Sequence, residues 1–363
     1  MSKYDTSFHL SFRGMLLVVC KPFHFIDYIE CQSSFSDSST HSEIKGNFHR
    51  VAASMASHEY IFKEVGDVRI AADVHYVKDN TGAKHPIALY FHGGNFTVGS
   101  KELLSKNYIE RLLELGFVVI SANYRLCPTT TVYDGPVSDT LDAYRWAQNT
   151  LPGLLKRDSG IDVDGTEIVV LGHSCGGTLA LLTAGLPNPP LAILDLYGMK
   201  YLQDPFYSTP SVAMSKIPEF DKDFINQIYK DIPPPTSGPP PMGPQGPDFS
   251  NYRIAWMFNA IKEGKHMQTV IADGNSDRVD PATLFSKRKF PPTYFVHGTA
   301  DTLVHPKFSQ HAYDELKAKG METELVLVEG AGHGFDAKAK PGDDFFTIVN
   351  KGFEFLKAHI GTE

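Results

Sequence analysis

The chain has 363 residues, 42% of them hydrophobic and 12% aromatic, which is enough to bury a large core in one big domain with an elaboration. Its formal net charge is −8 at pH 7 and no lysine- and arginine-rich cluster occurs, so nucleic acid is not expected as a partner. Four cysteines (Cys20, Cys31, Cys127 and Cys175) lack the CxxC spacing of a zinc site or a disulfide framework, and they fit a reducing compartment.

The first 54 residues are rich in Ser, His and Phe and follow neither a helical nor a strand period. Their apolar run at 15–20 is shorter than a signal-peptide core, and no run in the chain reaches the roughly 18 residues of a membrane helix. We therefore predict that 1–54 form a poorly ordered extension, with a lid or docking segment as the alternative. We also expect a cytoplasmic protein that does not insert stably into membranes.

Regular patterning begins at Met55, so we predict that 55–363 form the functional domain. Alternating residues at 58–64 and 68–76 predict a pair of strands. Short apolar runs of strand length follow at 86–91, 117–124, 167–172, 190–198, 291–298 and 322–330. Segments of helix length occur at 103–115, 137–151, 175–186, 306–320 and 344–359. This alternation predicts an α/β fold with a mostly parallel sheet and helices on both of its faces.

The pattern breaks between about 200 and 290. Residues 233–247 read PPPTSGPPPMGPQGP and can form neither a core strand nor a helix, because proline lacks the backbone donor and fixes φ. The aromatic segment at 248–261 follows at once. We interpret the region as a cap insertion over one end of the sheet, with a plain surface loop as the alternative.

A sharp turn between a strand and a helix is predicted at 172–176, which reads GHSCG. Such a turn requires small residues two positions before and two positions after the nucleophile, because the backbone there is strained. Centring the turn on Ser174 satisfies this rule, whereas centring it on Cys175 would place His173 in a crowded flank. We therefore predict that Ser174 is the nucleophile and that the amide of Cys175 faces a developing oxyanion.

Gly93 and Gly94 follow the buried strand at 86–91 and leave its end with bare backbone, so they are candidates for the second oxyanion donor. A serine needs a base oriented by an acid, and both are expected later in the chain. His333 lies in a glycine-rich loop after the last strand, and Asp301 lies in the loop after the strand before it. The less favoured candidates, on the surface or in the cap, are His266, His305, His311, Asp273, Asp277 and Asp280.

Four motifs now stand in order along the chain: HGGN at 92–95, GHSCGG at 172–177, HGTAD at 297–301 and GAGHGF at 330–335. Together with ANYRLCP at 122–128, they resemble the α/β-hydrolase superfamily over roughly 58–360. Within it the chain looks like the hormone-sensitive-lipase and carboxylesterase-like branch, also called α/β-hydrolase fold-3.

The resemblance implies roles for individual residues. Ser174 would be the nucleophile, Asp301 the acid and His333 the base, while the oxyanion amides would come from Gly93, Gly94 and Cys175. The chain departs from the family where Asn95 replaces a common third glycine and where His173 replaces a frequent aspartate. These departures bear on the subfamily and the substrate, and not on the mechanism.

The resulting hypothesis is a serine esterase that acts on a small to medium apolar acyl substrate. Aromatic residues of the insertion are candidate pocket walls, with packing inside the cap as the alternative: Trp256, Phe258, Phe220 and Tyr207. The same triad could cleave a lactone, a thioester or an amide, and a noncatalytic binding module is the rival of another class.

We expect no cofactor and no metal, because neither a phosphate-binding GxGxxG nor a metal-ligand spacing occurs. The chain's one N-x-S/T sequon, at 95–97, would place a glycan beside the proposed oxyanion donors. This position disfavours secretion through a glycosylating pathway. The sequence carries no signal for the oligomeric state.

Overall fold

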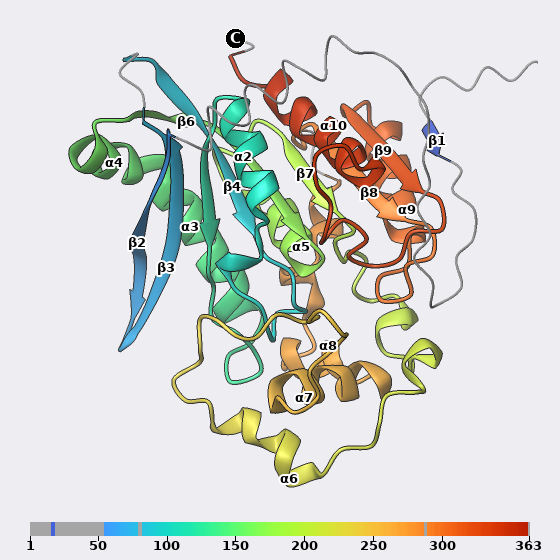
Figure 1. Ribbon diagram of the computed structural model, residues 1–363. Coiled ribbons are helices and arrows are strands. Elements are labelled where there is room, and N and C mark those ends of the chain that lie inside the picture. Colours follow the sequence, from blue (N-terminus) through green and yellow to red (C-terminus); the bar gives the residue numbers. More distant parts are fainter. Residues whose placement is uncertain (1–15, 19–53, 79–81, 287–288, 362–363) are drawn as a thin grey trace, which may run out of the picture.

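The computed structural model describes residues 16–18, 54–78, 82–286 and 289–361 (Figure 1). A nine-stranded sheet forms its centre, in the order β1-β9-β8-β7-β6-β4-β5-β3-β2. The strands are β1 (Leu16–Val18), β2 (Met55–Val65), β3 (Val68–Val77), β4 (Lys84–Phe91), β5 (Val118–Ala122), β6 (Asp162–His173), β7 (Ile193–Leu196), β8 (Thr293–Gly298) and β9 (Thr323–Val328). Only the pairs β2 with β3 and β3 with β5 are antiparallel, so the predicted mostly parallel sheet is confirmed.

Helices cover both faces of the sheet (Figure 1). They are α2 (Lys106–Glu114), α3 (Ser138–Asn149), α4 (Leu151–Ser159), α5 (Cys175–Leu182), α9 (Lys307–Ala318) and α10 (Asp344–Ala358). Side chains alternate along each strand, so β4 sends Leu89 into the core with α3, α5 and α9 and sends Tyr90 into the core with α2 and α10. Burial on both faces explains the continuous apolar runs in the sequence.

Several helix boundaries differ from the prediction. The helix expected at 103–115 begins at Lys106, because the Ser105 side chain accepts a hydrogen bond from the Tyr108 amide and caps the helix there. Helix α4 was not predicted; its proline lies in its first turn, where the missing N–H costs nothing. This helix ends at Gly160, which has a φ of 80°.

The predicted N-terminal extension, 1–54, lies outside the described residues apart from Ser54 and β1, which pairs in parallel with β9. Its order therefore stays a prediction. Among the described residues, no helix combines the length and the apolar character needed to cross a bilayer.

Residues 200–290, called the cap below, contain α6 (Lys222–Ile225), α7 (Tyr252–Lys262) and α8 (His266–Ile271). Figure 1 places these three helices together beyond the carboxyl ends of the central strands. The ring of Phe249 lies 5.3 Å from that of Phe220 and 5.7 Å from that of Phe258, measured between centroids. The candidate pocket walls Phe220 and Phe258 therefore pack inside the cap.

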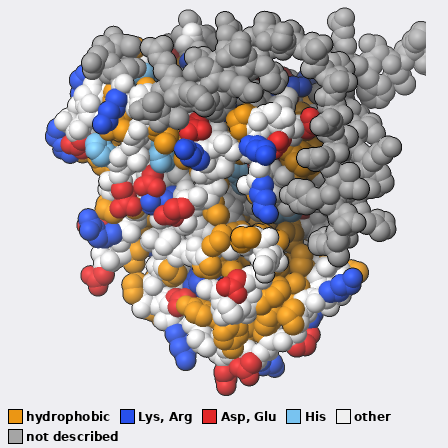
Figure 2. All heavy atoms as spheres, viewed as in Figure 1, with side chains coloured by type: hydrophobic (Ala, Val, Ile, Leu, Met, Phe, Trp, Pro, Cys, Tyr) orange, Lys and Arg blue, Asp and Glu red, His pale blue; other side chains and the backbone are white. Residues whose placement is uncertain are grey.

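Tyr207 stacks on Phe308 of α9 at 5.1 Å. The indole N–H of Trp256 donates to the Tyr229 hydroxyl. The candidate pocket walls Tyr207 and Trp256 are therefore also in contact with neighbouring side chains. Figure 2 shows hydrophobic side chains gathered over the cap, and Ile232 is among its large exposed ones.

Candidate active site

Ser174 lies between β6 and α5, with φ 54° and ψ −125°. This backbone conformation is costly for a residue with a side chain, and it persists only where the surroundings enforce it. A Cβ on Gly172 would lie 2.2 Å from the Gly176 carbonyl oxygen, and one on Gly176 would lie 2.1 Å from that of Phe91. Both flanking positions therefore require glycine, as the rule that centred the turn on Ser174 assumes.

Cys175 is fully buried beneath a neighbouring loop. Its sulfur accepts a hydrogen bond from the Phe96 amide at 3.2 Å and lies 3.6 Å from the Tyr124 hydroxyl. Burial raises the pKa of the thiol to about 11, so it is protonated at neutral pH. The side chain of Cys175 thus serves packing, while its amide stands at the first position of α5, where N–H groups lack a partner within the helix.

The loop after β4 lies against Ser174. A Cβ on Gly93 would be 3.3 Å from the Cβ of Ser174, so the main chain of Gly93 is in direct contact with the turn. Gly94 has a φ of 119°, and a Cβ there would lie 2.1 Å from the Val98 carbonyl oxygen. Only glycine fits at Gly94 without displacing the main chain.

The structure brings His333 and Asp301 into contact. Nδ1 of His333 lies 2.7 Å from Oδ2 of Asp301, and the other carboxylate oxygen accepts the amides of Leu303 and Val304 at 2.8 and 3.0 Å. Burial by itself raises the pKa of Asp301, but hydrogen bonds from His297 and His333 outweigh it and hold the pKa below its usual range. The carboxylate is therefore ionised at neutral pH and fixed in orientation.

Ser174 and His333 contact two consecutive residues at the carboxyl end of β7, Leu196 and Tyr197. The Ser174 amide donates to the Leu196 carbonyl at 2.8 Å, and the ring of Tyr197 lies 4.7 Å from the ring of His333. The Ser174 hydroxyl makes no hydrogen bond to any described residue.

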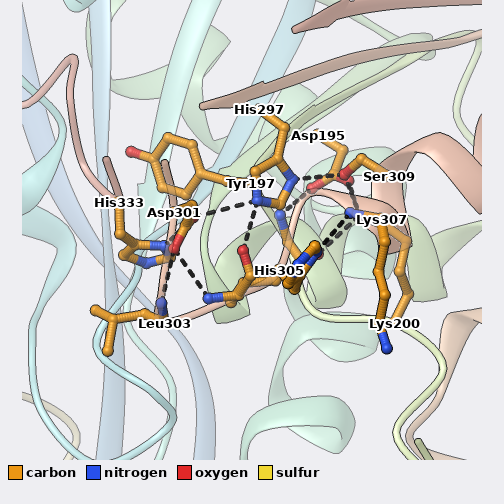
Figure 3. Close-up of polar contacts among 12 residues, drawn as sticks. Asp195, Tyr197, Lys200, His297, Asp301, Leu303, His305, Lys307, Ser309 and His333 are labelled. Atoms are coloured by element: carbon orange, nitrogen blue, oxygen red, sulfur yellow. Dashed lines mark hydrogen bonds and ion pairs between the residues drawn. The ribbon is translucent and has the colours of Figure 1, made fainter. Parts of the chain in front are cut away.

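A second histidine lies behind the acid (Figure 3). Nε2 of His297 is 2.8 Å from the Val304 carbonyl and 3.2 Å from Oδ2 of Asp301. Both partners are acceptors, so this nitrogen carries the proton. Nδ1 then accepts from the Ser309 hydroxyl at 2.7 Å, and that hydroxyl accepts from the Lys200 ammonium at 2.9 Å.

The chain of contacts ends on a fully buried ion pair between Lys200 and Asp195, 2.7 Å apart (Figure 3). Lys200 also donates hydrogen bonds to the Gly198 carbonyl at 2.7 Å and to the Ser309 hydroxyl at 2.9 Å. Burial lowers the pKa of Lys200, and Asp195 opposes this effect. This buried network of hydrogen bonds and an ion pair supports Asp301 from behind.

Asp336, three residues after His333, is a further buried acid. Its carboxylate lies 2.8 Å from Nε2 of His173 and accepts the hydroxyls of Tyr197 at 2.6 Å and Tyr108 at 3.0 Å. These bonds tie the loop that carries His333 to the residue before Ser174. Burial alone raises the pKa of Asp336, but the charge of His173 and the hydrogen bonds outweigh it and hold the pKa low.

The anchoring role of Asp336 was not predicted from the sequence. The residue closes the GAGHGFD segment, and a second acid so close after the predicted base was the available signal. Of the less favoured candidates, His305 and His311 are exposed, whereas His266 is a buried residue of the cap. In the part of the chain that the structure describes, no group of three or more His, Cys, Asp or Glu residues is placed to bind a metal.

Comparison with known proteins agrees with this architecture. A family model for the alpha/beta hydrolase fold matches residues 88–201, and a model for the prolyl oligopeptidase family matches residues 251–363. A hyperthermophilic esterase from the archaeon Pyrobaculum calidifontis superposes with a TM-score of 0.58 at 22% identity, covering 89% of this chain and 93% of that chain. A protein of unknown function from Staphylococcus aureus superposes with a TM-score of 0.63 at 21% identity, covering 84% and 98%.

The curated relatives include large enzymes. A non-reducing polyketide synthase of Emericella nidulans is 30% identical over 81% of this chain, and one of Penicillium brasilianum is 28% identical over 93%. The chain spans only 13% and 16% of the length of these two relatives.

A mostly parallel sheet with helices on both faces and a serine at the sharp turn after β6 define the α/β-hydrolase fold. The chain therefore has the α/β-hydrolase fold, and the family match at 88–201 agrees with the resemblance seen in its motifs.

Proposed function

We propose that the protein is a serine hydrolase that cleaves carboxylic esters through an acyl-enzyme. Ser174 attacks the acyl carbon, His333 takes its proton and passes it to the leaving group, and Asp301 fixes the imidazole. The amides of Gly93, Gly94 and Cys175 bind the oxyanion. Water then releases the acyl group, with His333 as the base again.

The placement of the candidate residues carries this proposal. The backbone of Ser174 is strained and is in contact with the main chain of Gly93. His333 and Asp301, which lie 2.7 Å apart, are in the loops after the adjacent strands β9 and β8 of the same sheet. Strained backbone is retained where function requires it. The strained turn and the buried network behind Asp301 favour a catalytic role over a noncatalytic binding module.

A thioester is the second candidate substrate, and the relatives favour it. Several of them are non-reducing polyketide synthases, and acyl chains in polyketide synthesis are carried as thioesters. The same acyl-enzyme route accepts a thiolate as leaving group, so the catalytic residues do not change. For either bond we propose a small to medium apolar acyl group; lactones and amides are the remaining alternatives.

The test compares an oxygen ester and a thioester that carry the same acyl group. Wild type, Ser174→Ala and Cys175→Ala are assayed after circular dichroism shows that all three are folded. We expect Ser174→Ala to lose turnover of both substrates and Cys175→Ala to keep most of it, while the ratio of the two kcat/KM values identifies the preferred bond. Loss of activity in Cys175→Ala alone, or an inert wild type, would contradict the proposal.

A further inference from the structure

The loop that follows β4 is strained over three consecutive residues. Gly94, Asn95 and Phe96 have φ values of 119°, 53° and 61°. Positive φ is costly for residues with a side chain, and such a run persists only if its surroundings hold it in place. We call residues 93–99 the oxyanion loop, because Gly93 and Gly94 are the proposed oxyanion donors.

The main domain supplies part of what holds the loop. Within the loop, the amides of Thr97 and Val98 donate to the Gly94 carbonyl at 3.0 Å. Outside it, the Phe96 amide donates to the Cys175 sulfur at 3.2 Å, and the Phe96 carbonyl accepts the Cys127 amide at 2.8 Å. Among the described residues, none of the main domain donates a hydrogen bond to the Thr97 carbonyl.

The cap supplies that bond through Arg253 of α7, which is only 4% exposed. Nε and Nη2 of Arg253 donate to the Thr97 carbonyl at 3.1 and 2.9 Å, and Nη2 also donates to the Cys127 carbonyl at 2.6 Å. Nη1 pairs with the carboxylate of Asp231, another cap residue. A planar guanidinium with its donors engaged in this way is a rigid clamp, which a flexible ammonium would not be.

The proline-rich segment adds main-chain contacts to the same loop. The Gly99 amide donates to the Pro239 carbonyl at 2.8 Å, and the Gly238 amide donates to the Gly99 carbonyl at 2.9 Å. Prolines lack a donor, so Gly238 is the residue that allows the bond in this direction. His266 of α8 also contacts the loop, with Nε2 3.0 Å from the Thr97 hydroxyl.

We infer that Arg253, fixed by Asp231, is a positioning residue that sets the geometry of the oxyanion hole from the cap. This inference rests on the proposed function and extends it, because the cap then contributes to the chemical step. Arg253 acts through the Thr97 carbonyl, which lies three residues after Gly94. Oxyanion stabilisation depends on donors held at a fixed distance, so a relaxed loop weakens binding of the transition state more than binding of the substrate.

The first experiment measures hydrogen exchange in peptides that cover 93–99. Arg253→Gln removes the clamp, and Asp231→Asn loosens it while leaving Arg253 in place, so the second variant serves if the first does not fold. Arg278→Gln is the matched control, because Arg278 forms an exposed pair with Asp273 in the same cap. We expect faster exchange of the loop in both clamp variants and unchanged exchange in the control. Unchanged exchange in the clamp variants would overturn the inference.

The second experiment separates chemistry from substrate binding. Loss of one oxyanion donor costs about 100- to 1,000-fold in kcat, so displaced donors in Arg253→Gln should cost about 10- to 100-fold, with KM changed less than about twofold. A trifluoromethyl ketone, which forms an oxyanion adduct with the serine, should lose affinity by the same factor as kcat/KM. A raised KM with unchanged kcat and unchanged ketone affinity would mean that Arg253 only shapes the pocket, and would overturn the inference.

The two possible failures remain distinguishable. A wild-type protein that neither turns over esters nor reacts with a fluorophosphonate would overturn the proposed function and, with it, this role of Arg253. An active wild type whose clamp variants keep normal exchange and normal kcat would overturn the role of Arg253 alone.

Discussion

Replacing Asp336 with asparagine removes a buried charge while keeping the shape of the side chain. The carboxylate is 1% exposed and has three partners, at 2.6 Å from Tyr197, 2.8 Å from His173 and 3.0 Å from Tyr108. An amide carries no charge, so all three hydrogen bonds lose an ionised acceptor, and a hydrogen bond to a charged group is worth about 1.5–3 kcal/mol. We expect Asp336→Asn to lower the free energy of unfolding by about 3 kcal/mol at pH 7.

The effect should depend on pH in a defined direction. The folded state holds the pKa of Asp336 below its unfolded value of about 3.9. Its stabilisation is therefore fully present above that unfolded value and is lost as the pH falls through the lower folded value. The difference between wild type and Asp336→Asn should thus be constant near neutral pH and shrink below about pH 4.

Urea unfolding monitored by fluorescence measures this difference at several pH values. Asp314→Asn, at an exposed position of α9, is the matched control and should change the free energy of unfolding by less than about 0.5 kcal/mol. A loss below about 1 kcal/mol in Asp336→Asn, or a loss that grows as the pH falls below 4, would refute the reasoning.

Three further outcomes test other parts of the site. Asp301→Asn should lower kcat by about 10,000-fold, because the amide no longer fixes the tautomer of the base; steady-state kinetics on an activated ester would show it, and a loss below tenfold would contradict the assignment. Gly94→Ala should lower kcat by more than about tenfold with the protein still folded, because its Cβ would lie 2.1 Å from the Val98 carbonyl; near-normal kinetics would show that the loop tolerates the displacement. Cys175, buried with its pKa raised to about 11, should resist iodoacetamide in the native protein and react after unfolding, and rapid native labelling detected by mass spectrometry would be the contrary result.

Much of the fold could be predicted from local patterns. Strands buried on both faces, such as β4 and β6, read as continuous apolar runs, and their order along the chain fixed the class of the fold. The helix boundaries were predicted less accurately where a helix-capping side chain or a proline decides them, as at Ser105 and in α4. The cap gave no periodic signal, because its contacts with the rest of the chain are made largely by loops and single side chains.

The candidate site was likewise predicted only in part from the sequence. Ser174, Asp301 and His333 each stand at a strand end inside a recognisable motif, and the structure brings Asp301 and His333 into contact. The partners of the supporting residues were not predictable, because they are remote in sequence: Arg253 meets Thr97 across 156 positions, and Asp336 meets His173 across 163. Only the folded chain shows which buried polar residue satisfies which partner.

The central claim is that Ser174 is an activated nucleophile. The most direct measurement is to treat the folded wild type and Ser174→Ala with a fluorophosphonate and to locate the adduct by peptide mass spectrometry. The account predicts rapid, stoichiometric labelling of Ser174 in the wild type and none in the variant. Labelling at another residue, or a wild type that stays unmodified, would contradict it.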